Sequence, residues 1–222
     1  MPSSLLPANE YFVEFIPQAG SSAHVVIDLE TLDTKPSAAV IAVGAAAVIP
    51  DSRKTYLFYY PVTLDSNLEV GRTINGDTLG WWMRLVPQSP EAAKLMEVVS
   101  LSGEENTHYG LGHVLIKLFD WLHNLVKDKS NLYVWGNGAD FDIAILNSAF
   151  AGCGLDIPWY YGNVRCLRTL RFVSGFHDKW PDYYDMVKPM VPHHAMYDAL
   201  AEALWLDVIL DNLNHQKFQH AD

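Results

Sequence analysis

The stretch His24-Val25-Val26-Ile27-Asp28-Leu29-Glu30 is a run of β-branched and apolar residues that contains two acidic side chains. Its composition predicts a buried β-strand. Because successive side chains of a strand point to opposite faces, Asp28 and Glu30 share one face. Two buried carboxylates on one face repel each other and lose hydration, and a bound cation would offset that cost. Oxygen ligands favour Mg²⁺ or Mn²⁺. The alternative is a strand end at which both acids face water.

Further apolar runs predict that this strand belongs to a mixed sheet. Residues 39–49 and 55–62 are expected to add two antiparallel strands, because only short turns join the three runs. A fourth strand is predicted at residues 132–135. Helix formers and apolar periodicity predict helices at residues 77–83, 90–99, 111–126, 141–150, 165–173 and 195–213. The element order is typical of an α/β domain whose sheet is covered by helices.

Composition and charge limit the classes of function. Hydrophobic residues make up 50% and charged residues 18% of the 222 residues, as expected for a globular protein with its own core. The formal net charge of −11 argues against tight, nonspecific binding of duplex DNA, which usually needs a basic face. A small site for a strand end stays possible, because metal ions can supply local positive charge.

The two ends of the chain differ in character. Residues 1–22 contain three prolines and end in Gly-Ser-Ser, so we interpret them as an N-terminal extension before a domain at residues 23–222. The start lacks a signal-peptide pattern, and the two cysteines lack metal-ligand spacing. These features favour a cytoplasmic protein without a membrane partner.

A third acidic residue, Asp142, follows Phe141 at the predicted start of a helix. It comes just after the strand at 132–135 and a turn of sequence Gly-Asn-Gly-Ala. A carboxylate in the first helical turn is favoured by the helix dipole, so ordinary helix capping is an alternative explanation. On the residues alone, Asp140 competes with Asp142 for the same role.

A histidine and an aspartate stand at the predicted start of the last helix. His193 and Asp198 are five residues apart, and the helix start is expected to bring them close in space. The carboxylate suits a metal ion, and a neutral imidazole suits a general base near pH 7. His194 is an alternative base, and His193 could equally be a polar residue at the helix entry.

Three motifs thus occur in order: D-x-E at residues 28–30, N-x-x-x-F-D at 137–142 and H-x-x-x-x-D at 193–198. This arrangement resembles the DEDDh exonuclease superfamily, which is named for its Asp-Glu-Asp-Asp-His set. Within the resemblance, the F-D step selects Asp142 over Asp140, and the H-x-A-x-x-D-A pattern selects His193 over His194. Residues 33–40, 43–45 and 134–138 are similar to the branch of phage exonucleases described as exodeoxyribonuclease VIII or RNase T-like exoribonucleases.

The resemblance implies an RNase H-like fold and hydrolysis of single-stranded DNA or RNA from the 3′ end, with release of nucleoside 5′-monophosphates. Two Mg²⁺ or Mn²⁺ ions would be held by Asp28, Glu30, Asp142 and Asp198, with His193 as the general base. If the protein is phage-encoded, it would act in the cytoplasm of the host cell. The alternative is a non-catalytic nucleic-acid-binding or regulatory module on the same fold.

Substrate contacts are expected beside the acidic residues. Thr31 adjoins the metal-binding strand, and one of Trp81 and Trp82, for which we favour Trp82, is expected to stack on a base. Asn137 could contact the strand or only shape its turn. A locally basic stretch suits phosphate groups, although a solvated face is the alternative. Its residues are Arg165, Arg168, Arg171, Lys179 and Lys188, of which Arg165 is the favoured contact.

Overall fold

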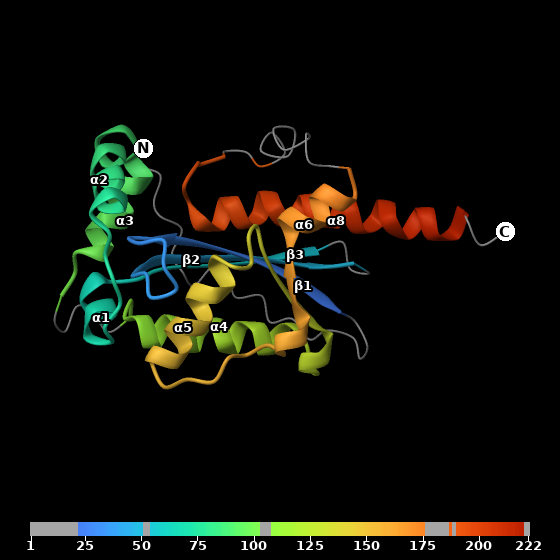
Figure 1. Ribbon diagram of the computed structural model, residues 1–222, viewed down its shortest axis with the longest axis horizontal. Coiled ribbons are helices and arrows are strands. Elements are labelled where there is room, and N and C mark those ends of the chain that lie inside the picture. Colours follow the sequence, from blue (N-terminus) through green and yellow to red (C-terminus); the bar gives the residue numbers. More distant parts are fainter. Residues whose placement is uncertain (1–21, 51–53, 103–107, 176–186, 188–189, 220–222) are drawn as a thin grey trace.

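A five-stranded sheet with the strand order β3-β2-β1-β4-β5 lies at the centre of the computed structural model (Figure 1). The structure describes residues 22–50, 54–102, 108–175, 187 and 190–219. Strand pairing is antiparallel from β1 to β2 to β3 and parallel from β1 to β4 to β5. The strands are β1 (Ala23–Thr31), β2 (Val40–Ile49), β3 (Lys54–Pro61), β4 (Leu132–Gly136) and β5 (Val164–Cys166).

Helices cover both faces of this sheet, which confirms the predicted mixed sheet with flanking helices (Figure 1). One face carries α4 (Leu111–Leu125) and α5 (Asp142–Gly152), whose apolar side chains pack on the sheet in the largest hydrophobic core. The long helix α8 (Ala195–Gln219) crosses the other face, and α6 (Leu167–Val173) packs beside it. At one end of the sheet lie α1 (Leu64–Glu69), α2 (Gly76–Leu85) and α3 (Pro90–Val99). Short 3₁₀ turns at 86–88, 129–131 and 161–163 complete the described elements.

Strand β2 determines how closely α8 can approach the sheet. All of its residues are buried, because helices cover it on both sides. Gly44 pairs with Asp28 of β1 and lies under the first turn of α8. A Cβ atom at Gly44 would lie 2.1 Å from the carbonyl carbon of Ala195, so only glycine permits this approach. The start of α8 is therefore held directly beside the acidic segment of β1.

Two parts of the predicted element order differ from the structure. Residues 165 and 166 were expected at the start of a helix but belong to the edge strand β5, and the helix begins only at Leu167. Three residues are too few to display the alternation that identifies a strand. Helix α1 was not predicted, because a helix of 6 residues carries little periodic signal.

The proposed N-terminal extension, residues 1–22, lies outside the described residues apart from Ser22. Within the described part of the chain, no helix combines the length and the apolar character that a membrane crossing requires.

Candidate active site

Three carboxylates meet at the junction of β1 and α8. Asp28 and Glu30 share one face of β1, as the strand period predicts, and Asp198 joins them from the first turn of α8. One oxygen from each of these side chains lies within 4.8 Å of the others. Among the described residues, these three form a cluster whose spacing suits a shared metal ion.

The fourth acidic residue, Asp142, approaches β1 from the start of α5. Its side chain is 5% exposed, and its Oδ1 atom accepts a hydrogen bond of 3.3 Å from the backbone N–H of Leu29. Gly136 makes room for it, since a Cβ atom there would lie 3.2 Å from Asp142 Oδ2. Asp140, the competing residue, is exposed. The structure thus brings Asp142 against the segment between Asp28 and Glu30.

The two histidines at the entry to α8 have different surroundings. His193 is exposed, lines the cavity above the carboxylates, and has a backbone φ of 58°, in the left-handed region. His194 instead stacks on Tyr59 with ring centroids 4.2 Å apart, and burial lowers its pKa to about 4. The backbone N–H of His194 donates to Asp198 Oδ2 at 3.2 Å, which ties that carboxylate to the helix entry.

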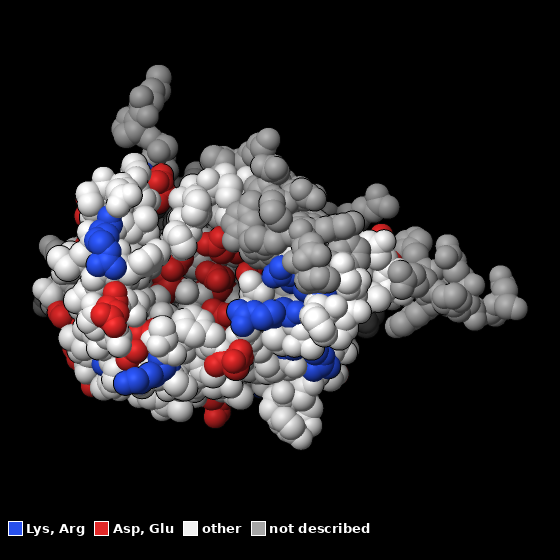
Figure 2. Space-filling view, turned by 45° about the horizontal axis from the view of Figure 1, so that its top comes forward, with Lys and Arg blue, Asp and Glu red and all other residues white. Residues whose placement is uncertain are grey.

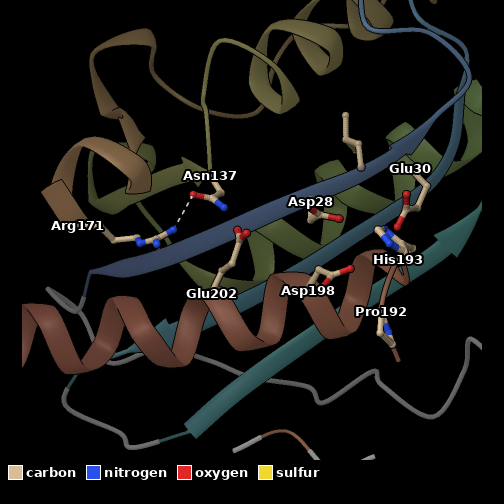
Figure 3. Close-up of a pocket in the computed structure, with 9 residues that line it drawn as sticks. Asp28, Glu30, Asn137, Arg171, Pro192, His193, Asp198 and Glu202 are labelled. Atoms are coloured by element: carbon tan, nitrogen blue, oxygen red, sulfur yellow. Dashed lines mark hydrogen bonds between the residues drawn. The ribbon is translucent and has the colours of Figure 1, made fainter. Parts of the chain in front are cut away.

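These groups surround an open cavity of about 660 Å³ (Figure 3). Figure 2 shows acidic side chains gathered in a hollow on this face, with basic side chains along one side of it. The described residues that line the cavity are Asp28, Leu29, Glu30, Asn137, Arg171, Pro192, His193, Asp198 and Glu202.

Burial and mutual repulsion change the acidity of the cluster. Burial, followed by repulsion from Asp198 and Asp142, raises the pKa of Glu30 to about 8. Burial likewise raises the pKa of Asp142 to about 7. The pKa of Asp28 is raised well above its ordinary value by burial and by the neighbouring carboxylates. Without a cation these groups resist ionisation, and a divalent ion would offset both causes.

A fifth acidic residue in the cavity, Glu202, was missed by sequence reasoning. It lies one turn after Asp198 on α8, is 3% exposed, and its Oε2 atom has no hydrogen-bond partner among the described residues. Burial and repulsion from Asp142 and Asp198 raise its pKa well above the ordinary value. The available signal was its spacing, because residues four apart share one face of a helix.

The donor set therefore fits a divalent metal centre. Its ligand atoms are carboxylate oxygens that converge on one cavity, and burial together with mutual repulsion raises the pKa values of Asp28 and Glu30. Asp28, Glu30 and Asp198 are placed to hold an ion together, and Asp142 stands directly behind the segment that carries the first two.

The two adjacent tryptophans of α2 have different roles. Trp82 is 2% exposed, and its Nε1 donates a 3.0 Å hydrogen bond to the carbonyl oxygen of Thr31. A ring covered by the core offers no face to a base, so the expected stacking role does not suit Trp82. Trp81 is 37% exposed and meets His193 edge-on, with ring centroids 4.8 Å apart. Trp81 is the tryptophan placed beside the cavity.

The other expected substrate contacts are placed unequally. Thr31 is 7% exposed, and its Oγ1 donates to the carbonyl oxygen of Asp33 at 2.8 Å. Arg165 lies outside the cavity lining: its guanidinium donates to the carbonyl oxygens of Gly162 and Val164 and covers the Tyr133 ring. Asn137 does line the cavity.

Within the basic stretch, Arg171 rather than Arg165 lines the cavity. Arg168 donates to the carbonyl oxygen of Asn137 at 2.7 Å. Lys179 and Lys188 lie outside the described residues.

Comparisons with solved structures show that the fold is shared with known nucleases. The fold is similar to the crystal structure of cell-death related nuclease 4 (CRN-4), with a TM-score of 0.58 and 14% identity over 86% of this chain and 64% of that one. The chain thus spans just under two thirds of the length of CRN-4. It is also similar to the nuclease domain of 3′hExo, a DEDDh family member bound to rAMP, with a TM-score of 0.55 and 13% identity over 88% of this chain and 95% of that domain.

The comparison with curated proteins gives no match. The family model described as the 3′-5′ exoribonuclease Rv2179c-like domain matches residues 23–210, a segment that runs from β1 into α8 and contains all five residues of the DEDDh pattern. This protein therefore belongs to the family of 3′-5′ exoribonuclease Rv2179c-like domains.

Proposed function

We propose that the protein removes nucleotides one at a time from the 3′ end of a single strand, with two Mg²⁺ or Mn²⁺ ions and His193 as the general base. The observation that carries this proposal is the convergence of Asp28, Glu30 and Asp198 within 4.8 Å, with His193 on the wall of the same cavity. RNA is the favoured substrate, since the family description names an exoribonuclease and the 3′hExo domain is bound to rAMP.

Each residue of the candidate site has a separate role in the proposed reaction. Asp28, Glu30, Asp142 and Asp198 would hold the ions, which activate water and stabilise the leaving oxygen when bound. His193 projects from the helix entry into the cavity, where an imidazole nitrogen accepts the proton of the attacking water. Its exposure leaves the ring free to reach a water molecule and to pass the proton to solvent. Trp81, in edge contact with His193, would stack on the terminal base.

The overall acidity supports a small substrate over a long duplex. With a net charge of −11, the protein lacks the charge for broad nonspecific binding, and the acidic hollow would repel phosphate without cations (Figure 2). Binding is therefore expected to depend on divalent ions and to involve a few nucleotides at a strand end.

The test uses 5′-end-labelled single strands of RNA and DNA with the same sequence, each incubated with Mg²⁺, Mn²⁺ or EDTA. The expected result is a ladder shortened from the 3′ end, nucleoside 5′-monophosphate as product, and no reaction in EDTA. The Asp28→Asn variant serves as the inactive control. Metal-independent cleavage, or shortening from the 5′ end, would overturn the proposal.

A further inference from the structure

The end of the cavity opposite His193 has a distinct chemical character. Figure 3 shows His193 and Pro192 at one end of the row of carboxylates, and Arg171, Asn137 and Glu202 at the other. Arg171 is the only lysine or arginine among the described residues that line the cavity. One fixed positive charge thus faces a cavity whose described lining includes four acidic side chains.

Neighbouring side chains hold Arg171 in place. Its guanidinium lies 3.7 Å above the ring of Trp205, which is fully buried. Its Nη1 atom donates to Asn137 Oδ1 at 3.5 Å, the contact drawn in Figure 3. Glu202 lines the same end of the cavity, and the positive charge of Arg171 acts on its carboxylate. A guanidinium stacked on an aromatic ring and tied to an amide needs little rearrangement before it binds an anion.

The direction of the reaction shows which part of the substrate reaches this end. In an in-line displacement, the attacking water and the leaving oxygen are on opposite sides of the phosphorus atom. Removal of the terminal nucleotide makes the 3′ oxygen of the retained strand the leaving group. If His193 activates the water, the retained strand leaves the reaction centre toward Arg171.

We propose, on the basis of the proposed function, that Arg171 binds the phosphate that precedes the scissile phosphate in the retained strand. Asn137 and Glu202 position the Arg171 guanidinium. The planar guanidinium offers paired N–H donors to two phosphate oxygens. Bound metal ions would neutralise the charge of the scissile phosphate, whereas the preceding phosphate would be repelled by the carboxylates without such an ion. Arg171 offsets that repulsion. A strand that carries the preceding phosphate therefore binds better than a substrate with a single phosphodiester.

The experiment measures kcat/KM for two oligonucleotides that differ at one linkage. One has a natural phosphate at the linkage before the scissile one, and the other has a neutral methylphosphonate there. Wild-type enzyme is expected to prefer the natural strand by about 10- to 100-fold, the range of one hydrogen-bonded charge contact. Arg171→Met should cut both strands at similar, reduced rates, and Arg171→Lys should keep part of the preference because it retains the charge.

The two positioning residues are tested by the same ratio. Glu202→Gln removes the negative charge near Arg171 but keeps the size of the side chain, so it should retain more of the preference than Glu202→Ala. The matched control is Lys129→Met, which removes one exposed positive charge outside the cavity lining and should leave the ratio unchanged. Partial unfolding cancels in these ratios, because both substrates are cut by the same sample.

Each outcome has a single meaning. If Arg171→Met still prefers the natural strand as the wild type does, Arg171 does not read that phosphate, although the exonuclease proposal stands. If both strands resist wild-type enzyme with Mg²⁺ and with Mn²⁺, the proposed function itself fails.

Discussion

Replacing Gly44 by alanine tests whether the approach of α8 to the sheet assembles the metal site. The added Cβ atom would lie 2.1 Å from the carbonyl carbon of Ala195, 2.3 Å from its oxygen and 2.4 Å from the next backbone nitrogen. Ordinary contact begins at 3.4 Å, so the start of α8 would have to move by about 1.3 Å, the difference between 3.4 and 2.1 Å. The obstructing atoms are backbone, so no side-chain rotation relieves the clash.

That movement affects the residues carried by α8. Asp198 lies in the first turn of α8 and His193 just before it, so both would withdraw from Asp28, the register partner of Gly44. A displacement of about 1 Å at a catalytic group can reduce the rate by about 10²-fold. Overpacking of a core also costs about 1–3 kcal/mol of unfolding free energy. We therefore expect Gly44→Ala to remain folded at low temperature but to lose at least about 100-fold in kcat/KM.

The assay is metal-dependent shortening of an end-labelled single strand, together with calorimetric titration of Mn²⁺ and thermal unfolding. Gly112→Ala on α4 is the matched control, because a Cβ atom there meets nothing within 4 Å. The control should keep wild-type activity. A Gly44→Ala protein with wild-type kcat/KM and Mn²⁺ affinity would refute the idea that this glycine sets the geometry of the site.

Three further predictions concern the acidic cluster and the base. Asp28→Asn should abolish hydrolysis and weaken Mn²⁺ binding while keeping the fold, as checked by calorimetry and circular dichroism; normal strand degradation would contradict the metal assignment. His193→Ala should slow the reaction by about 10²–10⁴-fold with unchanged metal affinity, and a wild-type rate would remove it from the mechanism. The pKa values of Glu30 and Asp142 rise from 4.5 and 3.8 to about 8 and about 7, so folding favours their protonated forms. The metal-free protein should then lose stability as pH rises from about 4 to about 8, and added Mn²⁺ should raise Tm more at pH 8 than at pH 5. A melting temperature in EDTA that rises with pH across this window would contradict the predicted direction of the stability change.

The central acidic residues could be predicted because each belongs to a local pattern. The two-residue period of a strand places Asp28 and Glu30 on one face whatever lies around them. His193 and Asp198 stand at a helix start that the following apolar periodicity identifies. Their convergence could be expected only from the resemblance, since it depends on how α8 crosses β1. Gly44, whose missing side chain permits that crossing, gives no local signal of its role.

The surroundings of the other expected site residues depend on tertiary contacts. The order of two tryptophans in one helix does not reveal which one faces the core, and the structure buries Trp82. Arg165 was chosen over Arg171 although both are arginines of one basic stretch, and only the packing of α6 against α8 turns Arg171 toward the cavity. In the sequence, Glu202 is one more polar residue of a long helix, and only the packing of α8 on the sheet buries it.

The backbone conformation of His193 affects which substitutions at this position would stabilise the protein. With φ at 58°, His193 has a left-handed backbone conformation. This conformation costs a residue other than glycine or asparagine about 1–2 kcal/mol of conformational free energy. Glycine would relieve this strain, so a His193→Gly protein should melt at a higher temperature than His193→Ala while its reaction is slowed to the same extent. In the proposed mechanism, stability and catalysis therefore favour different residues at this position.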